Sequence, residues 1–388
     1  MADSAGNRRC AGILIEAMNT ARGRLPDEVR AMWVVRTSMV SPQAIDRVVE
    51  LTRAYGFNTL FAQVRGRGDA YYRASYEPRA EALTGQPADF DPLGYLLQQA
   101  QVAGLMVHAW LNVYYVWSRP QRPRSPLHVV NRSNHWIARD MRNRYQMTTA
   151  GRVEGVYLCP SNPDVRAHLL QVFGEVARRY PALDGIHMDY VRYPYEGYCY
   201  CAGCRARFRA WMTAQVSERQ RREVDRQARR SPLAWIEAFP AAWDDWRRDQ
   251  VSLFVSAFAR QSRQINPRLI LSAAVYPSPL GAYRHKLQNW TLWLRRDWLD
   301  TVLPMAYDPD TAVVMRQIAQ SLQAADGRPV IGGIGAYRIP PESTLNKIRT
   351  LRRLGARGFC LFSYDTITRE GLSEEYLRRL APAVAFSG

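Results

Sequence analysis

The sequence predicts an α/β protein folded as a (β/α)8 TIM barrel with long insertions after the third and fourth strands. Three observations support this fold class. Eight short runs rich in Val, Ile and Leu are spread along the 388 residues, as expected for parallel strands that are covered on both faces. Helical patterns separate most of these runs. The last four runs start about 30 residues apart, which is the length of one βα unit.

The elements follow in order. The first two expected strands, 32–36 and 59–65, enclose a helix at 42–55 with Ser41 as its N-cap and Pro42 at its first position. The third strand, 105–112, follows a helix at 91–103. The remaining expected strands are 185–190, 269–276, 301–307, 330–337 and 358–364, and the remaining helices are 163–179, 244–264, 311–325 and 341–353.

Two intervals between strands are much longer than one βα unit. They span about 113–160 and 191–242, and both follow the C-terminal end of a strand, which places them on the catalytic face of a barrel. We expect a single barrel domain over 30–388, after an N-terminal extension over 1–29. A doubly wound open sheet is the alternative, but no GxGxxG motif follows the first strand.

The chain is strongly basic, with 53 Lys and Arg against 35 Asp and Glu and a net charge of +18. This indicates an anionic partner such as an acidic glycan, nucleic acid or a membrane surface, or else a solvated surface. The segment 117–144 holds seven Arg against one Asp, and 205–230 holds nine Arg against three acids, in a pattern typical of an exposed basic helix.

Neither a membrane span nor a signal peptide is predicted. No apolar run approaches the length of a transmembrane helix. The apolar run at 11–15 is too short for a signal-peptide core. The sequence as written therefore predicts a cytoplasmic protein, and a longer natural N-terminus would allow export.

Three of the six cysteines form a CxCxxC motif, Cys199, Cys201 and Cys204. Three soft ligands make a zinc site only if a fourth Cys or a His joins them. No second CxxC supplies that ligand, which favours unmetallated thiols that pack an insertion. We therefore expect no metal and no cofactor.

Polar residues at the C-terminal ends of barrel strands are the candidates for chemistry. Asp189 and Asp308 are the candidate catalytic carboxylates, on the fourth and sixth strands. His187 and Asp189 are two residues apart and share a strand face, with His187 one layer deeper. The candidate substrate-binding residues are Gln63, Arg65, Asp69, His108, Trp110, Asn112, His187, Arg192, Tyr193, Tyr307, Tyr337 and Asp365.

Carboxylates, aromatic rings and amides together suit carbohydrate chemistry. Glycoside cleavage uses one carboxylic acid to protonate the leaving oxygen and a second carboxylate to attack the sugar or activate water. Asp189 and Asp308 are expected to face each other across the cleft, with Asp69, Glu196 and Asp365 as other possible partners. The alternative for a strand-end Asp is a helix cap or a turn, and for His187 a structural core position.

Four ordered segments carry a family resemblance. They are FAQVRGRGDAYYRASYEPRAEALTG (61–85), DFDPLGYLLQQAQVAGLMVHAWLNVY (89–114), LCPSNPDVRAHLL (158–170) and DGIHMDYVRYP (184–194). Together they resemble the glycosyl-hydrolase-like family ten, which includes a bacterial glycosidase acting on denuded peptidoglycan. The resemblance implies a TIM barrel that hydrolyses glycosidic bonds.

The same resemblance implies roles for single residues. Asp189 matches the acid that closes the strand-four motif, and Tyr190 stands where the family often has a second acid. Related barrel glycosidases carry the nucleophile on strand four and the acid/base on strand six, which is similar to Asp189 with Asp308.

These observations give a leading hypothesis and two rivals. The leading hypothesis is a glycoside hydrolase acting on a polysaccharide, with bacterial cell-wall glycan as the candidate substrate. The lactyl carboxylates of that glycan would be attracted by the arginines of the two insertions. The rivals are a catalytically inactive glycan-binding barrel, suggested by Tyr190, and a nucleic-acid-binding protein using 205–230, which lacks any recognised nucleic-acid fold motif.

Overall fold

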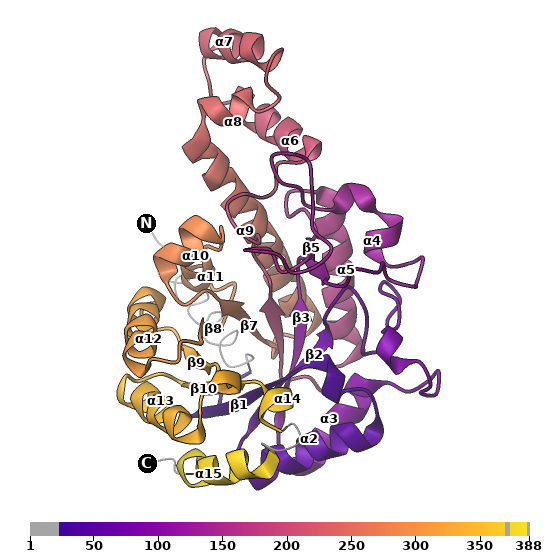
Figure 1. Cartoon of the computed structure of the whole chain (residues 1–388), viewed down its shortest axis with the longest axis vertical. Coiled ribbons are helices and arrows are strands. Elements are labelled where there is room, and N and C mark those ends of the chain that lie inside the picture. Colours follow the sequence, from indigo (N-terminus) through magenta and orange to yellow (C-terminus); the bar gives the residue numbers. More distant parts are fainter. Residues whose placement is uncertain (1–22, 369–372, 386–388) are drawn as a thin grey trace, which may run out of the picture.

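The computed structural model describes residues 23–368 and 373–385, and it confirms the predicted barrel (Figure 1). Eight parallel strands close into a barrel in the order β1-β10-β9-β8-β7-β6-β3-β2. All eight lie at the predicted segments. They are β1 (Val29–Val34), β2 (Thr59–Arg65), β3 (Met106–Asn112), β6 (Gly185–Asp189), β7 (Ile270–Val275), β8 (Thr301–Ala306), β9 (Ile331–Ile334) and β10 (Gly358–Phe362).

Some strand ends differ from the prediction. The predicted strand 330–337 ends at Ile334, because the 3-10 helix η4 (Ala336–Arg338) takes over. The predicted strand 358–364 ends at Phe362, because Tyr364 begins the short helix α14 (Tyr364–Ile367). The predicted domain start at residue 30 falls inside β1.

Helices cover the outside of the barrel. Ser41 Oγ accepts a hydrogen bond from the Ala44 amide at 3.2 Å, and Pro42 opens α2 as predicted. The long helix α9 begins at Pro240, earlier than the predicted 244. The covering helices are α2 (Pro42–Ala54), α3 (Pro92–Ala103), α5 (Pro163–Arg179), α9 (Pro240–Ile265), α12 (Thr311–Ala325), α13 (Pro341–Arg353) and α15 (Ser373–Ala385).

The barrel interior is packed with large side chains. Trp33, Phe61, Trp110, Leu303 and Ile331 are each at most 3% exposed and form one cluster inside the ring of strands. Burying an aromatic or aliphatic side chain of this size contributes about 2 kcal/mol relative to leaving it in water. These packed side chains fill the barrel interior toward the N-terminal ends of the strands. A ligand can therefore enter only at the C-terminal ends.

Both predicted insertions lie at the C-terminal ends of their strands. The first contains the antiparallel pair β4 (Tyr115–Trp117) and β5 (Val156–Tyr157) with α4 (Val129–Arg132). Two short helices, α10 (Pro279–His285) and α11 (Trp290–Arg295), follow β7. Among the described residues, no helix is both long and apolar enough to cross a membrane.

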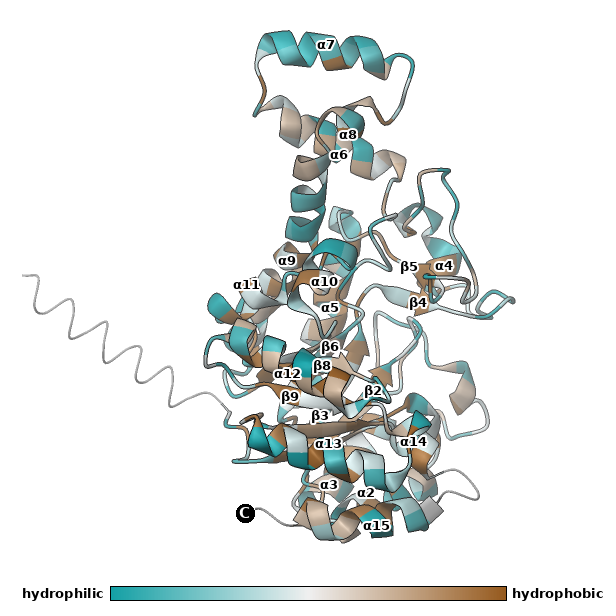
Figure 2. Ribbon diagram, turned by 60° about the vertical axis from the view of Figure 1, so that its left-hand side comes forward, coloured by the Kyte–Doolittle hydropathy of each residue, from teal (hydrophilic) through white to brown (hydrophobic). Residues whose placement is uncertain are grey.

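The second insertion forms a projection that extends well beyond the barrel, with part of α9 as its stem (Figures 1 and 2). It contains α6 (Ala202–Thr213), α7 (Glu218–Ala228) and α8 (Ala234–Ala238). The single basic helix expected over 205–230 is therefore wrong. Ser217 breaks it, because its side chain and that of Gln220 form a capping box that starts α7.

Candidate active site

A cavity of about 320 Å³ opens at the C-terminal ends of the barrel strands. Its wall is built from strand-end residues on most sides of the barrel, which is where TIM barrels carry their active sites. The lining residues are Trp33, Val35, Arg36, Gln63, Trp110, Asn112, Tyr115, Asp189, Tyr190, Arg192, Ala274, Met305, Tyr307, Tyr337 and Phe362. Seven of the predicted site residues are among them: Gln63, Trp110, Asn112, Asp189, Arg192, Tyr307 and Tyr337.

Asp189 ends β6 and is the one carboxylate among the described residues that line this cavity. Its side chain accepts a hydrogen bond from the Tyr190 amide at 2.6 Å, and the residue is 7% exposed. Burial raises the pKa of Asp189 to about 6, although the Arg192 charge and hydrogen bonds from Tyr190 and Trp110 act in the opposite direction. A carboxyl with this pKa holds its proton in a useful fraction of molecules near neutral pH.

One wall of the cavity is a cation stacked on two aromatic rings. The Arg192 guanidinium lies 4.7 Å from the centre of the Tyr190 ring, which in turn stacks on Tyr115 at 4.6 Å. Tyr190 has a φ of 49°, a left-handed conformation that turns the chain sharply after β6. The turn presents both Asp189 and Arg192 to the cavity.

Glu154, which the sequence analysis did not single out, lies behind this wall. Arg192 donates to Glu154 at 2.9 Å and to the Tyr157 hydroxyl at 3.2 Å. Burial alone would raise the pKa of Glu154, but the charges of Arg192 and Lys286 hold it below its ordinary value. The charge of Glu154 is close enough to contribute to the raised pKa of Asp189.

Arg36 supplies the second cation of the cavity. It begins the 3-10 helix η1 (Arg36–Ser38) after β1, and its Nη1 donates to Gln63 Oε1 at 2.6 Å. Within the described part of the chain, no acidic side chain forms an ion pair with Arg36. Arg36 was not among the predicted site residues. It is the last residue of the predicted strand 32–36, so the search for polar residues at strand C-termini could have found it.

Aromatic rings line the opposite side of the cavity. Tyr307 stacks on Phe362 with ring centres 5.3 Å apart, and Trp33 meets both rings edge-on at about 6 Å. Tyr337 is 40% exposed at the rim. Flat apolar faces beside a carboxyl and two guanidinium groups suit a sugar ring that bears charged substituents.

The two histidines predicted to bind substrate lie below the cavity instead. His187 Nε2 accepts from Trp33 Nε1 at 3.2 Å, so its proton is on Nδ1, which donates to Ser272 Oγ at 2.9 Å. His108 packs against Phe61 at 4.8 Å, and burial lowers the pKa of His108 to about 3. Both rings are neutral and support the floor, as the core alternative for His187 anticipated.

Arg65 was also expected to bind substrate, but it is completely buried in an ion pair. Its Nη2 lies 2.8 Å from Glu77 Oε1, and Glu77 also lies 2.9 Å from His168 Nε2. The pairing of β2 with β3 shifts register between Gln63 and Arg65. This irregularity turns Arg65 away from the face that Gln63 shares with the cavity.

Asp308 does not meet Asp189 in the cavity. Its Oδ1 accepts from the Asp310 amide at 2.9 Å, which forms the turn before α12. Asp365 instead joins the two ends of the barrel sheet, because it accepts from the Val35 amide at 2.6 Å and from the hydroxyl of Thr37 at 3.1 Å, both after β1. The turn alternative therefore describes Asp308, whereas Asp365 has a structural role between distant segments.

The remaining candidates also lie outside the cavity lining. Asp69 accepts from the Arg67 amide at 2.8 Å, and Glu196 pairs with Arg152 at 2.9 Å on the surface. Tyr193 is completely buried, and this burial raises its pKa well above the ordinary value.

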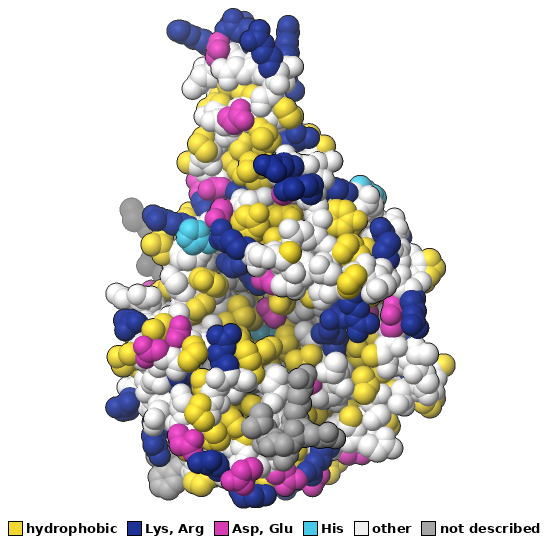
Figure 3. Space-filling view, viewed as in Figure 1, with side chains coloured by type: hydrophobic (Ala, Val, Ile, Leu, Met, Phe, Trp, Pro, Cys, Tyr) yellow, Lys and Arg dark blue, Asp and Glu magenta, His cyan; other side chains and the backbone are white. Residues whose placement is uncertain are grey.

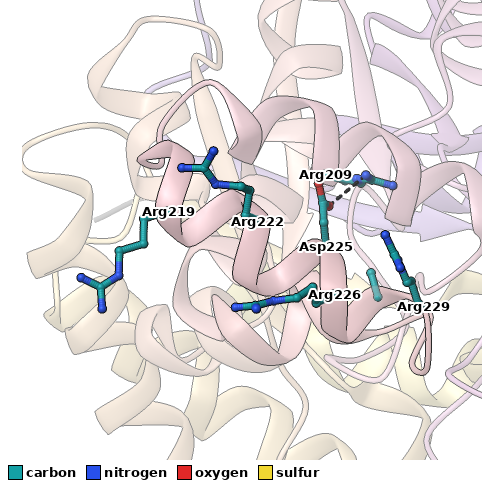
Figure 4. A pocket seen from close by; sticks show the side chains of 7 residues that line it. Arg209, Arg219, Arg222, Asp225, Arg226 and Arg229 are labelled. Carbon is teal, nitrogen blue, oxygen red and sulfur yellow. Dashed lines mark ion pairs between the residues drawn. The ribbon is translucent and has the colours of Figure 1, made fainter.

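A larger, open recess of about 690 Å³ lies on the projection (Figure 4). Five arginines and one acid line it, and Arg209 pairs with Asp225 at 2.9 Å. Basic side chains gather at the far end of the projection, over α7 (Figure 3). The arginines of α7 are therefore remote from the cavity, although the second insertion starts on the catalytic face as expected.

Comparison with known proteins identifies the family. The sequence model described as Glycosyl hydrolase-like 10 matches residues 28–342. The chain belongs to this family. The resemblance stated from the sequence is thereby confirmed. The family match covers seven of the eight barrel strands and ends at the start of α13, before β10.

Curated relatives share about a quarter of the aligned residues with this chain. The chain is 23% identical over 281 residues to the glycosyl hydrolase YngK of Bacillus subtilis, covering 68% of this chain and 47% of the relative. It is 25% identical over 284 residues to the glycosyl hydrolase DigH of Escherichia coli K12, covering 68% and 57%. The chain thus spans about half the length of the curated relatives it matches.

Solved structures confirm the fold. The glycoside hydrolase domain of PgaB (BpsB) from Bordetella bronchiseptica superposes with a TM-score of 0.67 at 16% identity, covering 93% of this chain and all of that one. The catalytic domain of β-amylase from Paenibacillus polymyxa gives 0.66 at 11% identity, covering 93% and 99%. At these identities the likeness establishes the barrel architecture only.

Proposed function

We propose that this protein is a glycoside hydrolase that cleaves an anionic polysaccharide, with Asp189 as its catalytic carboxyl group. One observation carries the proposal: Asp189 is a buried carboxyl with a raised pKa, and it faces an aromatic cavity at the catalytic end of a TIM barrel. Membership of a glycosyl-hydrolase-like family supports the reaction class. Mass spectrometry of glycan strands treated with wild type and with Asp189→Asn tests it.

In the proposed mechanism Asp189 acts as the general acid. Its proton passes to the glycosidic oxygen as the bond from that oxygen to the anomeric carbon breaks. Water then adds to the anomeric carbon and gives up one proton, which restores the balance of atoms and charge. Glu154 is the candidate base for this second step, because its carboxylate is ionised and pairs with Arg192, which lines the cavity.

The charges that line the cavity favour an anionic sugar. Arg36 and Arg192 face it together with a single carboxyl, Asp189. Peptidoglycan strands without peptides carry lactyl carboxylates, which a guanidinium group binds well. This substrate class agrees with the resemblance to glycosidases of denuded peptidoglycan and with the basic composition of the chain.

A catalytically inactive glycan-binding barrel is the second candidate. Tyr190 favours it, because an aromatic side chain stands where the family often has a second acid, and it lines the cavity. A binding protein would retain glycan without cleaving it, and Asp189→Asn would leave its affinity largely unchanged.

The pH profile tests the role of Asp189. If Asp189 is the general acid, kcat/KM falls about tenfold per pH unit above its pKa of about 6, because the protonated form is consumed. Initial rates on one glycan between pH 4 and pH 9 measure this. An activity that instead falls as the pH drops through 6 would make Asp189 the base or nucleophile. Asp308→Asn should leave the profile unchanged.

Arg36→Ala tests the preference for anionic substrate. Loss of one charged hydrogen bond should raise KM on a carboxylated glycan about tenfold and leave KM on the carboxyl-reduced glycan unchanged. Arg36→Lys, which keeps the charge, should recover part of the loss. An equal rise of KM on both glycans would show that Arg36 shapes the cavity without binding substrate charge.

The arginines of α7 should not affect turnover. The triple variant Arg219→Ala, Arg222→Ala and Arg226→Ala should keep kcat/KM on a short oligosaccharide within about twofold at physiological salt, because charges farther away than the Debye length of about 8 Å are screened. A large rise in KM would place α7 close to the bound substrate and contradict the observed separation.

A further inference from the structure

The two insertions meet at a cluster of four cysteines. Cys159 follows β5 in the first insertion, and Cys199, Cys201 and Cys204 lie before and within the start of α6 in the second. Their sulfur atoms all lie within 4.8 Å of one another, with Cys159 Sγ 3.3 Å from Cys204 Sγ and 3.9 Å from Cys201 Sγ. The CxCxxC motif thus gains the fourth soft ligand that the sequence alone did not reveal.

We propose that these four cysteines bind a single Zn²⁺ ion as thiolates. Zinc bound tetrahedrally by sulfur at about 2.3 Å places the sulfur atoms about 3.8 Å apart, which matches the observed spacing. An iron–sulfur cube binds each cysteine to a different iron atom, so it requires a wider set of sulfur atoms. All described cysteines are free thiols, so no disulfide competes for these ligands.

The surroundings of the cluster suit thiolate ligands. The Arg139 amide donates to Cys199 Sγ at 3.3 Å, and the Cys204 amide donates to Cys201 Sγ at 3.4 Å. Such N–H donors orient metal ligands and stabilise their negative charge. Cys201 is also the N-cap of the twelve-residue helix α6, whose first turn favours a thiolate.

A chain of hydrogen bonds connects the cluster to an arginine. Ser161 Oγ lies 2.9 Å from Cys204 Sγ and accepts from the Arg207 guanidinium at 2.9 Å. Zinc with four thiolates carries a net charge of about −2. Arg207, reaching Ser161 from α6, provides positive charge beside it. Cys159, Cys199 and Cys204 are all completely buried.

The ion would stabilise the cavity wall that Arg192 and Tyr190 form. Cys159 is two residues from Tyr157, whose hydroxyl accepts from Arg192, and the other three ligands follow Arg192 on the same insertion. Zinc therefore joins the segments that hold Glu154 and Arg192 in contact. This structural role does not depend on which reaction the cavity performs.

Metal analysis of the purified chain tests the proposal. Protein expressed with added zinc should contain about one zinc per chain by inductively coupled plasma mass spectrometry, and Cys159→Ser should contain little. Cys360→Ala is the matched control, because Cys360 is buried inside the barrel away from the cluster, and it should keep its zinc. Loss of the metal should lower Tm by at least about 5 °C.

Cobalt gives a second measurement that needs no variant. Removal of the metal and addition of Co²⁺ to the full chain should produce the visible absorption bands of a tetrahedral cobalt–thiolate site. Iron in place of zinc, two disulfides among the four cysteines, or four free thiols with no metal in the zinc-supplied protein would each overturn the proposal. These outcomes leave the glycosidase proposal intact, since the assay does not measure turnover.

Discussion

Asp189→Asn is expected to lower kcat by about 10³-fold while leaving the fold intact. Removing a general acid typically costs two to four powers of ten. Asn is nearly the same size and keeps the oxygen that accepts from the Tyr190 amide at 2.6 Å. Initial rates on an anionic glycan measure the effect, and the matched control Asp308→Asn should stay within about twofold because Asp308 lies outside the cavity lining.

The same substitution should stabilise the protein at pH 7. The pKa of Asp189 is raised to about 6 because its charged form is buried, so ionisation above pH 4 costs folding free energy. Asn never ionises, and Asp189→Asn should raise the free energy of unfolding by about 2 kcal/mol. A gain in stability with a loss of rate is the signature of a catalytic group. A loss of both would indicate a structural role.

Glu77→Gln should destabilise the protein by about 3–5 kcal/mol. Glu77 and Arg65 are completely buried with their charges 2.8 Å apart, and His168 adds a second contact to Glu77. Removing the carboxylate leaves the Arg65 charge buried without its partner. Urea unfolding measures the loss, and the exposed Glu50→Gln should change stability little.

The pH dependence of stability gives the same pair a second test. Burial alone would raise the pKa of Glu77, but the Arg65 charge and the hydrogen bond from His168 outweigh it and hold this pKa at about 2, below its ordinary value of 4.5. The contribution of the Glu77 carboxylate to the free energy of unfolding is therefore complete above pH 4.5 and is lost as the pH falls toward 2. Wild type should lose stability in this window more steeply than Glu77→Gln. Parallel curves would show that Glu77 is not the group responsible.

Much of the fold is readable from the sequence because parallel strands covered on both faces must be apolar throughout. The segment 59–65 is a strand over the predicted residues, and the segments 105–112 and 185–190 are strands to within one residue. Strand ends were less predictable, because η4 and α14 begin directly after β9 and β10.

The site was predicted where strand alternation holds and missed where tertiary contacts decide. Trp110 and Asn112 follow the two-residue repeat of β3 into the cavity. The same rule does not hold for Arg65, which lies outside the cavity because the register shift in β2 turns it away from Gln63. Cys159 is far in sequence from the CxCxxC motif, so only the meeting of the two insertions reveals it as a fourth ligand.

The most direct test of the proposed function is product analysis on peptide-free peptidoglycan strands. Purified wild-type protein and Asp189→Asn are incubated with the strands, and the soluble products are identified by mass spectrometry. We expect shorter glycan fragments, each gaining one water per bond cleaved, from wild type alone. Strands that stay bound and intact with both proteins would contradict it and establish a glycan-binding barrel.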